Sequence, residues 1–241
     1  MKISKLLYSS RFFPNIYVTG SPFKIYEYHS LLRFTRFSGN ELILDLGCGS
    51  GLQTCLLAKK SSKVFGLDVG DLTKAEAKAH RLENKLNIQF INTRLQDAPF
   101  SNGMFDKIFS FCVIEHIPEY LEILQLCHSL LKKGGELIIS VDSLAGIPAD
   151  LKNRHARQHA VSHYFRYEEL KDLLTELTFR EVRIKPMFCS KLAHTWFRKG
   201  ILKGFSYGIK KAIMMWLAMS IFEFFCCKRK EGIFLTAHCR K

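Results

Sequence analysis

The sequence predicts an α/β fold in which helices cover both faces of a parallel sheet. Short apolar segments alternate with amphipathic segments through most of the chain, as parallel strands alternate with crossover helices. The run LILDLGCGSG at residues 42–51 adds an apolar strand that leads directly into a glycine-rich turn. The length agrees with this class, because 241 residues with 47% hydrophobic content can bury one sizeable core.

The same alternation places each element in turn. Strands are predicted at residues 42–44, 64–68, 88–92, 107–111, 136–141, 181–185 and 232–238. Helices are predicted at residues 25–37, 52–59, 73–84, 119–131 and 167–177. The first helix ends at Gly39, and the helix 119–131 ends in the KKGG turn at residues 132–135, because glycine readily takes the left-handed conformation that ends a helix.

The run at residues 42–51 has the composition of a nucleotide-binding loop. Asp45 stands at the carboxyl end of the predicted strand, and three glycines follow it at alternate positions, Gly47, Gly49 and Gly51. These glycines allow a tight turn and a close backbone approach to a ligand. The next strand ends in Asp68, whose carboxylate can accept hydrogen bonds from both hydroxyls of a ribose. Two other interpretations use the same residues: the acids cap the segments that follow them, or the loop belongs to a dehydrogenase.

Further motifs follow in a fixed order. They are LDLGCGSG, VFGLDVG, APFSNGMFDKIFSFCVIEHIP, LLKKGGELIISVD and HYFRYEELKDLLTELTFREVRI. In this set the chain resembles the class I S-adenosylmethionine-dependent methyltransferases, over roughly residues 40–185. The resemblance is strongest to their small-molecule branch, with the methyltransferase type 11 and ubiquinone-biosynthesis-like enzymes. It implies a Rossmann-like, doubly wound seven-stranded sheet with an antiparallel last strand, and S-adenosylmethionine as the cofactor.

The resemblance also implies which residues hold the cofactor. It assigns the methionine and ribose parts to Asp45, Gly47, Cys48, Gly49 and Gly51. Asp68 would then bind the ribose hydroxyls, with Val69 beside the adenine. The acid that usually faces the adenine falls at Arg94 in this chain, so Asp97 is the nearby carboxylate left to accept from the adenine amine.

The segment after the fourth predicted strand contributes the acceptor side of the site. Cys112 is expected near the methionine end of the cofactor, in a packing role, because methyl transfer needs no covalent step. Glu115 and His116 stand where the resembled family often places groups that face the methyl acceptor. Either could be a general base, since imidazole titrates near neutrality, and helix capping or loop hydrogen bonding is the alternative role.

Three histidines, His155, His159 and His163, recur at the helical i, i+4 spacing, which predicts imidazoles on one face. No metal is predicted there, because no carboxylate or cysteine joins the pattern and Arg154 and Arg157 would repel a cation. The segment is instead expected to cap the acceptor pocket. The eight cysteines include no C-x-x-C pair, which predicts a reducing compartment without a disulfide framework or a zinc site.

Residues 190–230 form an insertion rich in Trp, Phe, Met and Lys before the last strand. Within it, residues 212–227 read AIMMWLAMSIFEFFCC, with basic residues on both sides and one acid, Glu223. The run is shorter than the ~20 apolar residues of a spanning helix, so we expect it to lie on an anionic membrane, with Trp216 and the lysines at the headgroups. An apolar lid and a dimer-forming helix are the alternatives.

The formal net charge of +14 predicts an anionic partner, which can be a membrane surface, a nucleic acid or an acidic substrate. With the insertion, the resemblance favours methyl transfer to a small, lipophilic or membrane-associated acceptor, such as a lipid, a quinone-like ring or a lipid-linked sugar. The alternatives are an RNA or protein methyltransferase and a non-catalytic, cofactor-binding membrane scaffold. Nucleic acid is disfavoured, because no recognition module is appended and FCVIEH stands where an N-P-P-Y-like motif would be.

A single methyltransferase domain is expected over residues 1–241. Its parts are a basic helical lead-in (1–40), the cofactor-binding core (41–189), the insertion (190–230) and the final strand (231–241). The first residues, MKISKLLYSSRFFP, lack the sustained apolar stretch of a secretory signal. The expected location is therefore cytoplasmic, with peripheral attachment at most to the inner face of a membrane.

Overall fold

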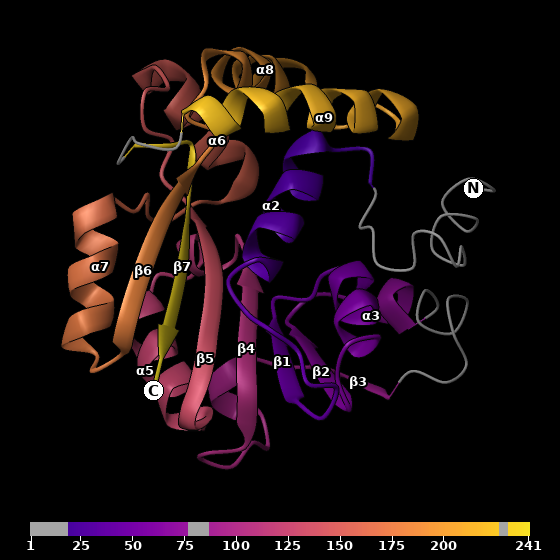
Figure 1. Ribbon diagram of the computed structural model, residues 1–241, viewed down its shortest axis with the longest axis vertical. Coiled ribbons are helices and arrows are strands. Elements are labelled where there is room, and N and C mark those ends of the chain that lie inside the picture. The colour runs from indigo at the N-terminus through magenta and orange to yellow at the C-terminus, as the bar shows by residue number, and fades with distance from the viewer. Residues whose placement is uncertain (1–18, 77–86, 227–230) are drawn as a thin grey trace.

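The computed structural model describes residues 19–76, 87–226 and 231–241 and is built around one central sheet (Figure 1). The strands are β1 (Leu42–Leu46), β2 (Lys63–Asp68), β3 (Ile88–Asn92), β4 (Phe105–Phe111), β5 (Leu131–Asp142), β6 (Arg180–Met187) and β7 (Phe234–Arg240). They form a seven-stranded sheet in the order β3-β2-β1-β4-β5-β7-β6. Strands β1 to β5 pair in parallel, whereas β7 is antiparallel to both β5 and β6. The predicted Rossmann-like, doubly wound sheet with an antiparallel last strand is confirmed.

Helices pack on both faces of this sheet and across one of its edges. They are α2 (Pro22–Leu32), α3 (Leu52–Ala58), α5 (Tyr120–Leu130), α6 (Ala149–His159), α7 (Tyr167–Glu176), α8 (Lys191–Lys203) and α9 (Ile209–Phe225), with short 3-10 turns η1 (Leu95–Asp97) and η2 (Ile114–His116). Helices α2 and α3 pack on one face, and α5 and α7 on the other. Ile43 of β1 faces the first pair and Leu44 the second, and both are fully buried. A strand that is covered on both faces has apolar side chains pointing to both sides, which explains why the sequence LILDL is almost continuously apolar.

Several element boundaries differ from the predictions. Helix α2 begins at Pro22, whose fixed φ suits a first helical turn, and ends at Leu32 rather than near residue 37. The residues after Leu32 leave the helix because they contact the sheet: Thr35 hydrogen-bonds Glu136, and the ring of Phe37 stacks on Phe109 at 6.1 Å. Strand β1 is longer than predicted. Strand β5 begins at residue 131, so the predicted turn at 132–135 is the irregular start of this strand.

Some predicted segments fall outside the described residues. These are residues 1–18 of the basic lead-in, most of the helix predicted at 73–84, and the basic residues that follow α9. Residues 73–76, which are described, are helical.

The insertion before β7 folds as two helices, α8 and α9, joined by residues 204–208. Both lie across the edge of the sheet at which the parallel strands end, above α2 and α6 (Figure 1). Among the described residues, no helix is both long enough and apolar enough to cross a membrane. Trp216 is half-buried and stacks on His29 of α2 at 5.4 Å, so part of its ring packs against the protein. Its position at lipid headgroups stays a prediction.

Candidate active site

The loop between β1 and α3 is shaped by glycines in left-handed conformations. The φ angles of Gly47, Gly49 and Gly51 are 73°, 49° and 70°. A Cβ atom on Gly47 would lie 2.3 Å from Cγ2 of Val113, so a side chain at this position would displace its neighbours. The backbone N–H groups of Gly47 and Cys48 donate to the carbonyl of Leu67 at 2.8 and 3.0 Å. The glycine loop is therefore held against β2 at the carboxyl end of β1.

Asp68 ends β2 beside the glycine loop. Its Oδ2 accepts a hydrogen bond from the N–H of Gly49, and its Oδ1 accepts one from the N–H of Gly70, both at 2.8 Å. Asn92 at the end of β3 donates to the carbonyls of Asp68 and Gly70 at 3.0 and 2.6 Å. The structure thus brings the predicted strand-end acid to the predicted loop. The bond to Gly70 is also the turn-capping contact that we considered as an alternative role for this acid.

Asp45 is buried beneath the glycine loop. Its Oδ2 accepts a hydrogen bond from Oγ1 of Thr54 at 2.6 Å, whereas Oδ1 has no hydrogen-bond partner among the described residues. Burial raises the pKa of Asp45 to about 7, although the bond from Thr54 acts in the opposite direction. Gly51 is the N-cap residue of α3, and no side chain caps this helix, so the capping role considered for Asp45 is not present.

A first cavity of about 820 Å³ opens beside the glycine loop and Asp68. Its lining comprises Leu46, Gly47, Leu67, Asp68, Val69, Arg94, Leu95, Gln96, Val113, His116, Ile117, Pro118, Glu119 and Glu122. Val69 is 70% exposed beside this cavity, which is unusual for an aliphatic side chain. Asp97 lies on the exposed side of η1 and is not part of the lining, which takes Arg94 and Gln96 from this segment instead.

A second cavity of about 490 Å³ lies on the other side of His116. Its apolar wall is formed by Phe23, Phe197, Phe205 and Phe234. Its polar wall includes Lys24, Cys112, His116, Asp142, His155 and His159. Because His116 lines both cavities, a molecule in one and a molecule in the other would be neighbours at this imidazole.

His116 and Glu115 therefore differ in position. His116 is half-buried with Nδ1 3.4 Å from the carbonyl of Ala160, and burial lowers its pKa, which favours the neutral imidazole. Glu115 is fully buried and lines neither cavity. Its Oε1 accepts from the N–H of Asp142 at 3.1 Å, and its carbonyl accepts from the N–H of Ser162 at 2.9 Å. Its contacts are those of a residue that holds neighbouring loops together.

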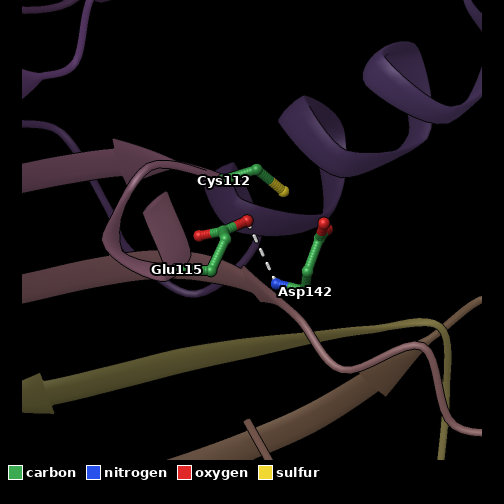
Figure 2. A group of neighbouring side chains, drawn as sticks. All are labelled: Cys112, Glu115 and Asp142. Carbon is green, nitrogen blue, oxygen red and sulfur yellow. Dashed lines mark hydrogen bonds between the residues drawn. The ribbon is translucent and has the colours of Figure 1, made fainter. Parts of the chain in front are cut away.

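Cys112, Glu115 and Asp142 gather at the ends of β4 and β5, and one donor atom of each lies within 4.8 Å of the other two (Figure 2). Cys112 has a φ of 52°, and its Sγ donates to Oε1 of Glu27 at 3.0 Å. Burial and the nearby carboxylates raise the pKa of Cys112, so the protonated thiol is favoured over a nucleophilic thiolate. Burial also raises the pKa of Asp142, to about 7.

Two acids near this cluster were not predicted from the sequence. Glu27 of α2 accepts a hydrogen bond from Oγ of Ser140, which joins α2 to β5, and it pairs with Lys24 of the same helix at 2.9 Å. Asp142 was also missed, although it ends a strand as Asp68 does, and that shared pattern was the available signal. No comparable sequence signal marks Glu27, because its partners come from distant strands.

The three histidines do not share one helix face. His155 and His159 are neighbours on α6, with ring centroids 4.6 Å apart. The helix ends at His159, and His163 instead pairs with Glu169 at 2.6 Å, so the prediction for the third imidazole is wrong. Nδ1 of His155 lies 3.0 Å from the hydroxyl of Tyr164, and burial lowers the pKa of this histidine to about 4.

The strand order, the glycine loop and the acid at the end of β2 together define the class of protein. They are those of the class I S-adenosylmethionine-dependent methyltransferases. Residues 44–139 match the family model described as a methyltransferase domain. This part of the chain is therefore a methyltransferase domain of that class.

The chain is similar to curated ubiquinone biosynthesis O-methyltransferases over part of their length. Over 99 residues the chain is 32% identical to the ubiquinone biosynthesis O-methyltransferase of Pseudomonas aeruginosa. This match covers 41% of this chain and 43% of the relative. Over 152 residues it is 27% identical to the enzyme of the same name from Erwinia tasmaniensis, covering 59% and 63%. The chain thus matches about half the length of these distant homologues.

Solved structures share the fold. Phosphoethanolamine N-methyltransferase 2 of Haemonchus contortus, in complex with S-adenosyl-L-methionine, is similar with a TM-score of 0.67 and 17% identity over 89% of this chain and 52% of that chain. Geranyl diphosphate C-methyltransferase of Streptomyces coelicolor has a TM-score of 0.65 and 14% identity over 88% and 74%. These two names cover nitrogen and carbon methylation, so the fold does not specify the acceptor.

Proposed function

We propose that this protein transfers the methyl group of S-adenosylmethionine to a small, lipophilic, membrane-associated acceptor. The observation that carries the proposal is the pair of cavities that share His116. The first adjoins the glycine loop and the second has a wall of phenylalanines. A donor in one cavity and an acceptor in the other would meet at a single point, as direct methyl transfer requires.

The residues of the first cavity fit the proposed cofactor. A volume of about 820 Å³ is within the usual range of cofactor sites. Asp68 is proposed to accept from the ribose hydroxyls, and the exposed side chain of Val69 would be covered by the adenine. Asp45, Gly47, Cys48, Gly49 and Gly51 are proposed to hold the methionine and ribose parts. For the adenine amine, we propose Gln96 in preference to Asp97, because Gln96 lines the cavity.

S-adenosylmethionine supplies an electrophilic methyl group on a sulfonium, so the protein must align the acceptor and remove its proton where it has one. We assign the proton-accepting role to His116, because it lines both cavities and its lowered pKa favours the neutral imidazole. Glu115 and Cys112 are proposed to have structural roles, since Glu115 lines neither of these two cavities and the thiol of Cys112 donates to Glu27.

The second cavity supports a lipophilic acceptor. Its aromatic wall suits an apolar ring or chain, and its opposite wall offers imidazoles and a carboxyl group for a polar substituent. The volume of about 490 Å³ accommodates one small molecule, or the reactive end of a larger lipid. Folded RNA or protein is less well suited to such a site than a small molecule is.

Calorimetric titration tests the cofactor assignment. We expect wild type and the control Asp172→Ala to bind S-adenosylmethionine and S-adenosylhomocysteine, and Asp68→Ala to lose at least tenfold in affinity. Asp172 is an exposed acid on α7, remote from both cavities. Binding of NADH alone, or no binding by wild type, would overturn the proposal. Transfer of a labelled methyl group to extracted lipids then tests for turnover, and cofactor binding without any transfer would favour the scaffold alternative.

A further inference from the structure

Helix α9 has two unlike faces. Its buried residues are Ala212, Met215, Met219 and Glu223, which recur at helical spacing and pack against the rest of the protein. We define the α9 apolar face as Met214, Leu217, Ile221, Phe222, Phe224 and Phe225. These six side chains are between 52% and 79% exposed, and they are six of the nine large hydrophobic side chains exposed among the described residues. Such a concentration on one helix marks an interaction surface.

The exposed charged side chains of α8 and α9 have one sign. Lys210 and Lys211 are exposed at the start of α9, and Arg198, Lys199 and Lys203 are exposed on α8. In both helices the sole acid is Glu223, and it is buried. Its two oxygens accept from the N–H groups of Cys189 and Ser190, both at 2.8 Å. The exposed surface of the two helices therefore combines large apolar side chains with positive charge and carries no carboxylate.

A bilayer with anionic lipids satisfies both properties. Apolar side chains insert among the acyl chains while lysines and arginines contact the headgroup phosphates. A second copy of the chain satisfies only the first property, because each copy carries a formal net charge of +14 and would present basic residues to basic residues. Since α9 is not long and apolar enough to span a membrane, it would lie along the surface.

The insertion that carries this face also walls the second cavity. Phe197 of α8, and Phe205 and Ser206 of the loop before α9, line that cavity. The N–H of Tyr207 in the same loop donates to the carbonyl of Gly20 at 2.8 Å, and Gly20 is also part of the lining. The α9 apolar face and part of the wall of the proposed acceptor site thus belong to the same insertion.

We propose that the α9 apolar face docks on an anionic bilayer and that the second cavity takes its acceptor from that bilayer. The second half of this statement rests on the proposed methyl-transfer function, whereas the docking itself does not. Docking would bring the cavity to a lipophilic acceptor that is scarce in water, so the enzyme would need no carrier for it.

Vesicle flotation tests the docking. The probes are phosphatidylcholine vesicles with and without phosphatidylglycerol, at low and high salt. We expect wild type to float with the anionic vesicles, less so at high salt, and the double variant Leu217→Glu/Ile221→Glu to lose roughly tenfold or more in bound fraction. The control is Leu121→Glu, which places one carboxylate at an exposed leucine of α5 and should float like wild type; the single variants Leu217→Glu and Ile221→Glu match it in charge and should float less.

Two further measurements on the same proteins separate the outcomes. Calorimetry with S-adenosylmethionine should give equal affinity for wild type and the double variant, which also shows that the variant is folded. If wild type binds the cofactor but does not float, the docking proposal is overturned and the methyl-transfer proposal stands. If wild type floats but does not bind the cofactor, the methyl-transfer proposal is overturned and the docking proposal stands. Sedimentation equilibrium tests whether a second copy of the chain binds the α9 apolar face instead. If wild type forms a dimer that the double substitution dissociates, and wild type does not float, the face would be assigned to a second copy.

Discussion

Glu223 of α9 accepts a hydrogen bond from the backbone N–H of Ser190, the N-cap residue of α8, at 2.8 Å. The other carboxylate oxygen accepts from the preceding N–H, that of Cys189, at the same distance. A carboxylate at the start of a helix satisfies N–H groups that have no partner within the helix and meets the positive end of its dipole. The acid inside the apolar run thus joins α9 to α8, and it is absent from the exposed face.

Removal of this carboxylate should destabilise the protein. For Glu223→Ala we expect the free energy of unfolding to fall by about 3 kcal/mol, because two buried N–H groups lose a charged acceptor. Glu223→Gln should lower the free energy of unfolding by less, because its amide oxygen can still accept a hydrogen bond. Urea denaturation measures both, with Glu176→Ala on the exposed side of α7 as a control that should change little. A Glu223→Ala protein as stable as wild type would contradict this role.

Substitution of Gly47 should impair the cofactor loop through a steric clash. In Gly47→Ala the new methyl would meet Val113, and we expect affinity for S-adenosylmethionine to fall at least tenfold by calorimetry. Gly47→Ala/Val113→Ala should recover part of that affinity. Gly103→Ala is the matched control: Gly103 also has a positive φ, but nothing lies within 4 Å of a Cβ there. The Gly103→Ala control should lower the free energy of unfolding by about 1 kcal/mol without any change in cofactor affinity. Unchanged affinity in Gly47→Ala would contradict the assignment.

His116→Gln should lower kcat strongly, by roughly 100-fold or more, while the affinity for S-adenosylmethionine stays near that of wild type. The neutral imidazole is the active form, so the rate should rise with pH and then level off. Because burial lowers the pKa of His116, the plateau should begin at a lower pH than for an unperturbed imidazole. The pH–rate profile of a labelled methyl-transfer assay measures this, with His128→Gln on α5 as the control. A wild-type kcat in His116→Gln would exclude the base role.

The buried Asp45 should make stability depend on pH. Its pKa is about 7 in the folded protein against an ordinary value of 3.8, so the folded state holds a proton that the unfolded state releases. This contribution is complete below pH 3.8 and is lost as the pH rises toward 7. The free energy of unfolding of Asp45→Asn should therefore fall less steeply with pH than that of wild type across that window, by up to about 1.4 kcal/mol per pH unit.

Denaturation of the cofactor-free proteins at several pH values measures this difference in slope. Asn can still accept the hydrogen bond from Thr54, so the variant should fold. Asp172→Asn, an exposed acid on α7, should keep the slope of wild type. If the plots of stability against pH are parallel for wild type and Asp45→Asn, burial does not raise the pKa of this carboxyl group.

The proposed donor half of the site was predictable because its signals are local. A positive φ favours glycine, and an acid at the end of a parallel strand lies at the ligand edge of the sheet, so Gly47, Asp45 and Asp68 could be placed from their neighbours in the sequence. The acceptor half was not predictable in this way. Glu27 meets Ser140 only because α2 packs on the sheet, and His163 leaves the histidine pattern because α6 ends first.

By itself, the sequence determined the alternating α/β architecture, the glycine loop, the acid after β2 and the apolar character of the insertion. Each of these follows from backbone conformation or hydrophobic pattern within a few adjacent residues. Only the tertiary structure decided that His116 lines two cavities, that Glu115 is buried away from both, and that Glu223 turns inward while apolar side chains of α9 face outward. The physical reason is that these outcomes depend on packing between segments distant in the chain, which a local pattern does not encode.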